Sequence, residues 1–157
     1  MISKCMKRDV ITVAPTDTVA HAAGVIAEKC VGTLPVVTDQ RHLIGIVRLQ
    51  DILKIFMPDF VALLDNIDFV NDFGALEQLR PRDLPAAANM TMRELMSPPI
   101  SVKSSCGLLR SFAIMNRHQL QDLPVVDEEG RLVGIASRVD IAAAFFRGFH
   151  DNPGYRA

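Results

Sequence analysis

The chain has 157 residues, of which 49% are hydrophobic and 22% charged, so it can build one globular domain, or two small ones, with a packed core. A formal net charge of -1 argues against the dense cationic surface that binds nucleic acid or anionic membranes. No uncharged apolar run approaches the roughly 18 residues of a membrane span. Cys5, Cys30 and Cys106 form an odd set without a C-x-x-C pair, so a reduced, cytoplasmic protein without disulfides is expected.

The first 56 residues predict one β-α-β-β-α unit. A short β-branched run at residues 10–13 is followed by N-cap candidates at 15–18 and by apolar residues at helical spacing to residue 27. Two apolar runs, 34–37 and 43–47, flank five polar residues, which is the pattern of a hairpin. A second helix is expected over residues 49–56.

An acidic insert is expected at residues 57–90. Residues 55–79 contain no Lys or Arg and carry five acidic residues, while apolar side chains recur at helical spacing, namely Phe60, Leu63, Leu64, Ile67 and Val70. This predicts an amphipathic helix. It either covers the module with its apolar side and leaves a solvated acidic face, or presents a surface on which a partner docks.

The first unit returns in residues 91–150, after which residues 151–157 are expected to form a flexible tail. Leu34-Pro35-Val36-Val37 recurs 89 residues later as Leu123-Pro124-Val125-Val126, and nine of twenty residues from Leu34 onward are identical without a gap. Residues 91–94 fit a capping box before the repeat, and Cys5-Met6 matches Leu95-Met96 with a shift of one residue. Each repeat is expected to be α/β (α+β), with its first strand-helix-strand connection crossing over right-handedly in a mainly parallel arrangement. Since a repeated unit rarely buries its apolar face alone, the two repeats should pack about a pseudo-twofold axis.

The segment from Gly134 to Asp140 carries the most suggestive chemistry. A strand ends there, Ser137 opens a helix and Asp140 lies three residues on. Unpaired N–H groups at a helix N-terminus suit a phosphate, and a nearby carboxylate can accept two hydrogen bonds from a ribose diol. The same two residues also fit a capping box that needs no ligand, and the two roles are compatible.

The doubled order of Ile-Thr/Ser-Val, Leu-Pro-Val-Val and Gly-Ile-x-x-x-x-Asp resembles a tandem pair of cystathionine beta-synthase (CBS) domains, the Bateman module. The resemblance implies regulatory, noncatalytic repeats with clefts for adenosine-type ligands. In the second repeat it implies a favoured site at Ile100, Ser101, Val102, Gln121, Asp122, Leu123, Pro124, Ser137, Arg138 and Asp140. In the first repeat the matching positions are Ile11, Thr12, Val13, Gly32, Thr33, Leu34, Pro35, Arg48 and Asp51.

Arg48 departs from the family pattern, which has Ser or Thr at this position. Its guanidinium can pair with a phosphate, or it can fill the cleft and pair with Asp51. In the second repeat, Lys103 and Arg138 are candidates to neutralise a phosphate.

The expected function is a sensor that binds AMP, ADP, ATP, S-adenosylmethionine or NAD and requires no cofactor. His21, His42, His118 and His150 show neither metal-ligand spacing nor a paired nucleophile, so neither a metal site nor catalysis is expected. Alanine-rich helix faces and the resemblance predict a homodimer. With no effector domain in this sequence, an effector protein is expected in trans. The alternative is a scaffold that dimerises or grips a partner without a ligand.

Overall fold

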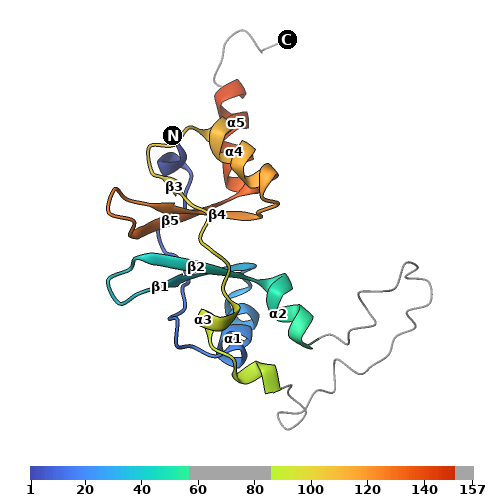
Figure 1. Cartoon of the computed structure of the whole chain (residues 1–157). Helices are drawn as coiled ribbons and strands as arrows, with labels where there is room; N and C mark the ends of the chain where they lie inside the picture. Colours follow the sequence, from blue (N-terminus) through green and yellow to red (C-terminus); the bar gives the residue numbers. More distant parts are fainter. Residues whose placement is uncertain (57–85, 151–157) are drawn as a thin grey trace, which may run out of the picture.

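The computed structural model describes residues 1–56 and 86–150 and shows two stacked halves of similar construction (Figure 1). The first half contains α1 (Val19–Lys29), β1 (Thr33–Val37), β2 (Leu43–Arg48) and α2 (Leu49–Phe56). The second half contains β3 (Val102–Lys103), α4 (Leu108–Arg117), β4 (Asp122–Val126), β5 (Leu132–Ser137) and α5 (Arg138–His150). Shorter segments lie ahead of the halves in sequence, namely η1 (Ile2–Lys4) before the first, and η5 (Ala86–Asn89) and α3 (Met92–Leu95) before the second.

Local capping explains where the helices begin. The Oγ1 of Thr18 accepts a hydrogen bond from the backbone N–H of His21 at 3.1 Å and starts α1. Thr91 starts α3 through the predicted capping box, in which its N–H donates to Oε2 of Glu94 at 2.7 Å. The mixed helix and strand content confirms the α+β class.

The strands pair mostly in antiparallel fashion, and the expected parallel arrangement holds only for the strand-helix-strand connections. β1 pairs with β2 and β4 pairs with β5 as antiparallel hairpins. Parallel pairing is confined to β3 with β4 and to a single bridge between Val13 and Val36. The short polar loops decide this, because five residues can reverse a strand but cannot carry the chain back for parallel pairing.

Reciprocal hydrogen bonds between the hairpin ends relate the two halves. The N–H of Leu43 donates to the carbonyl of Gly130 at 3.2 Å, and the N–H of Leu132 donates to the carbonyl of Arg41 at 2.8 Å. Each donor and each acceptor lies 89 residues from its counterpart in sequence. The halves therefore meet about the pseudo-twofold axis that the repeat predicts.

Each half also receives the segment that precedes the other half. The 3-10 turn η1 lies beside the second half, where Ile2 is fully buried in its core, and Lys7 forms an antiparallel bridge with Ile135 (Figure 1). Correspondingly, Met92 is fully buried in the core of the first half, and Ser97 forms a bridge with Ile46. The chain thus crosses between halves twice, and neither half has a complete core without the other's lead-in segment.

The repeated glycines make room for this exchange. A Cβ at Gly134 would lie 2.5 Å from Sδ of Met6, and a Cβ at Gly45 would overlap the side chain of Met96. Only a residue without a side chain lets the lead-in methionine pass so close to the strand.

The insert and the tail lie mainly outside the described residues. The amphipathic helix expected from Phe60 to Val70 and the tail at residues 151–157 fall there entirely. Of the expected insert, residues 86–89 are described as η5.

Candidate functional site

The turn from β5 into α5 holds Ser137 and Asp140 in one hydrogen-bonded unit. Ser137 donates to Oδ2 of Asp140 from its backbone N–H at 2.9 Å and from its Oγ at 2.7 Å. The N–H of Asp140 donates back to Oγ of Ser137 at 3.1 Å. This is the reciprocal capping arrangement that the spacing predicts, and it fixes the carboxylate at the start of the helix.

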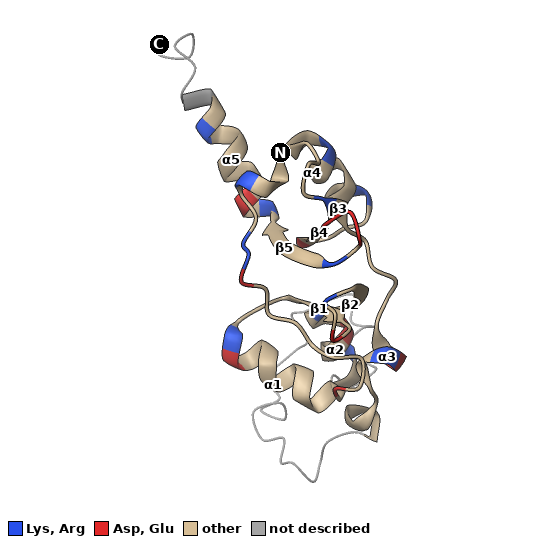
Figure 2. Cartoon of the chain, turned by 90° about the vertical axis from the view of Figure 1, so that its left-hand side faces the viewer, with Lys and Arg blue, Asp and Glu red and all other residues tan. Residues whose placement is uncertain are grey.

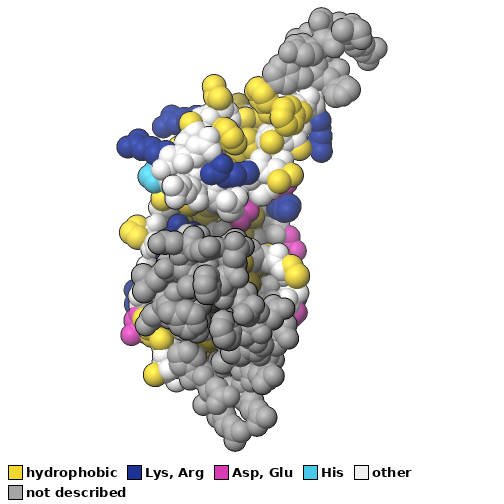
Figure 3. All heavy atoms as spheres, turned by 90° about the vertical axis from the view of Figure 1, so that its right-hand side faces the viewer, with side chains coloured by type: hydrophobic (Ala, Val, Ile, Leu, Met, Phe, Trp, Pro, Cys, Tyr) yellow, Lys and Arg dark blue, Asp and Glu magenta, His cyan; other side chains and the backbone are white. Residues whose placement is uncertain are grey.

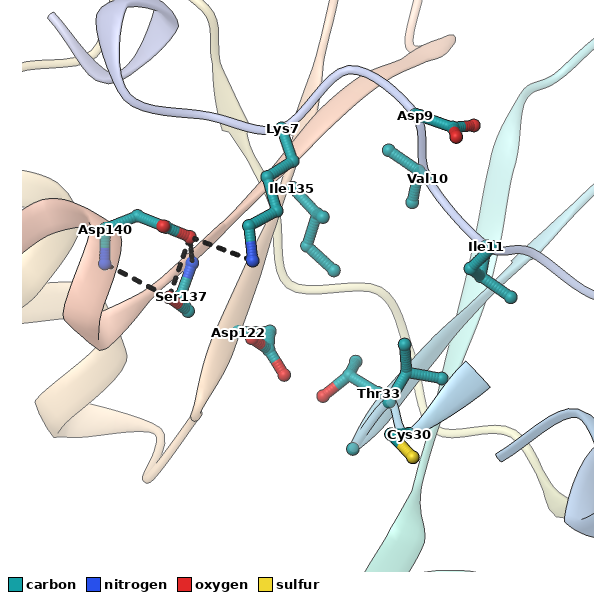
Figure 4. A pocket seen from close by; sticks show the side chains of 12 residues that line it. Lys7, Asp9, Val10, Ile11, Cys30, Thr33, Asp122, Ile135, Ser137 and Asp140 are labelled. Carbon is teal, nitrogen blue, oxygen red and sulfur yellow. Dashed lines mark hydrogen bonds and ion pairs between the residues drawn. The ribbon is translucent and has the colours of Figure 1, made fainter. Parts of the chain in front are cut away.

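The Asp140 carboxylate is partly buried and faces the amine of Lys7. Its side chain is 21% exposed, and Oδ2 lies 4.0 Å from Nζ of Lys7 (Figure 4). Burial raises the pKa of Asp140, but the side-chain and backbone hydrogen bonds from Ser137, together with the Lys7 charge, outweigh burial and leave the pKa below its ordinary value. Asp140 is therefore an anion at neutral pH.

This turn forms one wall of a cavity of about 190 Å³ between the two halves. The second half contributes Asp122, Ile135, Ser137 and Asp140. The opposite wall comes from the first half and its lead-in segment, with Lys7, Asp9, Val10, Ile11, Cys30, Val31, Gly32 and Thr33. Figure 4 shows Asp122 and Thr33 lying across this cavity from different strands. The cavity thus depends on how the halves sit against each other.

The structure regroups the site residues that the sequence predicted. Asp122, Ser137 and Asp140 of the second repeat line one cavity with Ile11, Gly32 and Thr33 of the first repeat. Ser101 and Val102, which were expected beside Asp140, line a separate hollow. The strand order β3-β4-β5 is the reason, because β4 separates the strand of Val102 from the strand that ends at Ser137.

Several predicted residues pack in the cores and do not line the cavity. Ile100 packs against the core of the second half, and Val13 is buried in the core of the first half. The Leu-Pro pairs of both repeats are fully buried, namely Leu34, Pro35, Leu123 and Pro124. Gln121 lines a neighbouring hollow with Arg48, and Thr12 lines none of the hollows described.

Arg138 does not face the cavity, in contrast to the expected phosphate contact. Its guanidinium donates to the carbonyl oxygens of Leu120 and Met115 and to Oδ1 of Asn116, at 2.6, 3.1 and 2.7 Å. These bonds hold the guanidinium against the C-terminal turn of α4 and the segment that follows it. Lys103 is also turned away, since its Nζ donates to the carbonyl of Asp127 at 2.6 Å.

In the first repeat, Arg48 pairs with Asp51, which is one of the two alternatives that the sequence left open. Nε donates to Oδ2 at 3.0 Å and Nη2 donates to Oδ1 at 3.3 Å. This two-pronged ion pair occupies the carboxylate that corresponds to Asp140. The two repeats therefore present unequal carboxylates, one held by a serine and one engaged by an arginine.

Comparison with known proteins places these two repeats in a family. The family model for the CBS domain matches residues 2–58 and again residues 92–147. The chain belongs to the CBS domain family. Each match includes a lead-in segment and the half of the fold that follows it in sequence, and the resemblance drawn from the repeated motifs is confirmed.

Similar solved structures are CBS pairs of comparable length. CBSX2 from Arabidopsis thaliana has 25% sequence identity and a TM-score of 0.74, with 96% of this chain and 97% of that chain covered. A structure of CBSX2 in complex with AMP has 26% identity and a TM-score of 0.69, with 93% of this chain and 96% of that chain covered. At least one similar CBS pair therefore binds an adenine nucleotide.

The curated relatives are longer than this chain. Homoserine O-acetyltransferase of Methanosarcina acetivorans is 28% identical over 145 residues, which is 92% of this chain and 22% of that protein. The chloroplastic CBSX1 of Arabidopsis thaliana is 28% identical over 145 residues, 88% of this chain and 60% of that protein. The chain thus spans from about a fifth to three fifths of the length of these two relatives.

Residues 1–56 and 86–150 also bear on two other kinds of site, one for a metal and one within a membrane. In these ranges, no three His, Cys, Asp or Glu side chains gather as a metal site would require. None of the helices described there is both long and apolar enough to cross a membrane.

Sequence reasoning missed Lys7 and Asp9, which enter the CBS cleft from the lead-in segment. The crossing of that segment onto the second repeat brings them there. Gly45 and Gly134, which recur in the second strand of each hairpin, were a usable signal. A glycine inside a strand often marks the close approach of another backbone.

Proposed function

We propose that this CBS pair is a regulatory module that binds an adenosine-type small molecule in the cavity between its repeats. One observation carries the proposal: the ionised, preoriented carboxylate of Asp140 lines a cavity built from both repeats. Such a carboxylate can accept both hydrogen bonds of a ribose diol, and apolar Ile11 and Ile135 offer flanks for a base. The AMP complex of the similar CBSX2 supports the same ligand class.

We further propose one ligand per chain. Asp51 already receives two hydrogen bonds from the Arg48 guanidinium, so a ribose would have to displace a charged partner. Asp140 receives its hydrogen bonds from Ser137 on Oδ2, and Oδ1 keeps its acceptor sites for a ligand. The second repeat's carboxylate is therefore the one that binds.

The binding state is passed on through the relative arrangement of the repeats. Gly32 and Thr33 come from one repeat and Asp122 and Ser137 from the other, so a ligand that touches all of them binds one arrangement more tightly than another. A separate effector protein then responds to the favoured arrangement. The role is regulatory and not catalytic, and the cytoplasmic location stays a prediction from the sequence.

Calorimetric titration with AMP and adenosine tests the ligand site. Asp140→Asn removes the charge that the ribose needs but retains an oxygen that can accept from Ser137, so the fold should persist. We expect binding by the wild-type chain and at least a tenfold loss in Asp140→Asn, about 1.4 kcal/mol. Asp39→Asn, in the exposed hairpin loop, is the matched control and should bind normally. Equal binding by all three proteins would remove Asp140 from the site.

An apolar groove between α4 and α5 favours a second function, as a dimerisation or interaction scaffold. It is lined by Leu108, Leu109, Phe112, Ile141, Ala142, Phe145 and Phe146. Leu109 is 78% exposed and Phe146 63% exposed, and hydrophobic side chains gather on this part of the surface (Figure 3). Exposed aromatic side chains that share one groove are typical of an interface.

Analytical ultracentrifugation tests this second function. If the groove joins two copies, the wild-type chain sediments as a dimer without a ligand, and Phe146→Ser shifts it to the monomer. Val139→Ser is the control, since Val139 is also exposed on α5 but does not line the groove. A monomeric wild-type chain at all concentrations would rule out the homodimer.

A further inference from the structure

The cavity between the repeats is strongly acidic. Among its lining residues, Asp9, Asp122 and Asp140 carry carboxylates, and Lys7 carries the one amine. At neutral pH the lining therefore holds more negative than positive charge. A ligand of the proposed function must be accommodated in this field.

Of these carboxylates, Asp140 is the one with compensating partners. It accepts hydrogen bonds from Ser137 and lies 4.0 Å from Nζ of Lys7. Within the part of the chain that the structure describes, the side chains of Asp9 and Asp122 have neither a hydrogen bond nor an ion pair. Asp122 therefore presents an uncompensated carboxylate to whatever enters, and exposed Asp9 adds a second one among the lining residues.

Asp122 lies beside the first repeat. It stands opposite Ser137 in the β4–β5 ladder, and a Cβ placed at Gly32 of the other repeat would lie 4.0 Å from its Oδ2. Figure 4 shows its carboxylate on the cavity side, between Ser137 and Thr33. A ligand tail that leaves Asp140 toward the first repeat has to pass this charge.

Three cations of the two repeats are held by other partners. Arg138 is bonded to the end of α4, Lys103 to the Asp127 carbonyl and Arg48 to Asp51. Lys7 does reach the cavity, but it already faces Asp140. A polyphosphate would therefore meet uncompensated carboxylates, and the residues that line the cavity include no arginine to offset them.

We propose that the cavity selects adenosine derivatives without net negative charge and discriminates against each added phosphate. This inference rests on the proposed function and names its ligand class. Adenosine should bind more tightly than AMP, and AMP more tightly than ATP. A positively charged adenosine derivative should bind at least as tightly as adenosine.

Calorimetry with matched ligands tests the proposal on the full chain. The series is adenosine, AMP and ATP without Mg²⁺, followed by the sulfonium S-adenosylmethionine and its neutral-sulfur counterpart S-adenosylhomocysteine. We expect ATP to bind at least about tenfold more weakly than adenosine at low salt, with the ratio shrinking in high salt because ions screen the repulsion. S-adenosylmethionine should bind more tightly than S-adenosylhomocysteine.

Charge-removing variants assign the effect to named residues. Asp122→Asn should reduce the adenosine-to-ATP ratio severalfold, and Asp9→Asn should reduce it less because Asp9 is exposed. Asp39→Asn removes the same charge outside the cavity and should leave the ratio unchanged. An unchanged ratio in Asp122→Asn would overturn the assignment.

The possible failures are distinguishable. If ATP binds as tightly as adenosine and Asp140→Asn abolishes both, charge selection is wrong and the ligand-sensing function stands. If none of the ligands binds, both proposals fall.

Discussion

Nζ of Lys7 lies 4.0 Å from Oδ2 of Asp140, although the two residues belong to different CBS repeats in sequence. The contact exists because the lead-in segment crosses onto β5 and pairs there through Lys7 and Ile135. Figure 2 shows this segment passing from beside the second half to the first. The side chain of Lys7 is 69% exposed, so the pair contributes little stability through its charge alone. Its importance is that it brings an amine to the wall of the cavity.

The stability of the chain should depend on pH through Asp140. Because the folded-state pKa of this carboxyl lies below its unfolded value of about 3.9, the folded chain binds the proton less readily. The carboxylate thus stabilises the fold above that unfolded pKa, and this contribution is lost as the pH falls through the lower folded pKa. The free energy of unfolding should therefore drop more in the wild type than in Asp140→Asn as the solution is acidified.

Urea denaturation across a pH series measures this difference. Asp127 and Glu94 also have lowered pKa values, since hydrogen bonds from Arg131 and Thr91 favour their charged forms, but both remain in the variant. Subtracting the two curves therefore isolates Asp140. Parallel curves from neutral pH to the acid limit would contradict the assignment, and Asp39→Asn should follow the wild type.

Gly134→Ala should destabilise the chain through Met6. The added methyl would lie 2.5 Å from Sδ of Met6 and 3.0 Å from the Lys7 carbonyl, so the lead-in segment must move. Overpacking of this kind costs about 1–3 kcal/mol. Gly24→Ala is the control, because a Cβ at Gly24 in α1 meets no atom within 4 Å and should stabilise the helix by about 0.5–1 kcal/mol. Opposite shifts of the melting temperature are expected, and a neutral Gly134→Ala would mean that the segment is not held against β5.

Ile2→Ala should weaken the second repeat, although Ile2 precedes the first. Its side chain is fully buried in a core that includes Met115, Leu123 and Ile141. Truncation of a buried isoleucine leaves a cavity and costs about 2–5 kcal/mol of unfolding free energy. Lys4→Ala, exposed in the same turn, should stay within about 0.5 kcal/mol of the wild type. Hydrogen exchange should show lost protection in β4 and α4, and a loss confined to the first repeat would refute the crossing.

Sequence reasoning could predict elements that depend on local chemistry. The helix at residues 49–56 and the capping box at Thr91 agree with the structure because neighbouring residues decide them. The Ser137–Asp140 unit was predictable for the same reason, since both partners lie within one helical turn.

The composition of the cavity was not predictable in the same way, because it depends on long-range placement. Asp140 meets Ile11 and Lys7 only after the lead-in segment crosses between the repeats, whereas the motif order paired Asp140 with Ser101. The direction of the Arg138 side chain likewise depended on the carbonyls of Met115 and Leu120, in and after the last turn of α4. Periodicity and spacing carry no information about either.

Arg48→Ser should open a second ligand site. Arg48 holds both oxygens of Asp51, whereas its counterpart Ser137 leaves one oxygen of Asp140 without a hydrogen bond from this pair. A serine at position 48 would release Asp51 to accept from a ribose diol, and would also remove a bulky side chain from the hollow that Gln121 lines. Calorimetry with adenosine should therefore give one site per chain in the wild type and two in Arg48→Ser.

Two further variants separate release of Asp51 from other effects of the change. Arg48→Lys keeps the positive charge beside Asp51 and should retain a single site, although it loses the two-pronged geometry. Arg48→Ser combined with Asp140→Asn should also bind one ligand, now through Asp51. Suppose that Arg48→Ser still binds one ligand and that adding Asp140→Asn abolishes this binding. Something other than the arginine would then keep the first repeat from binding.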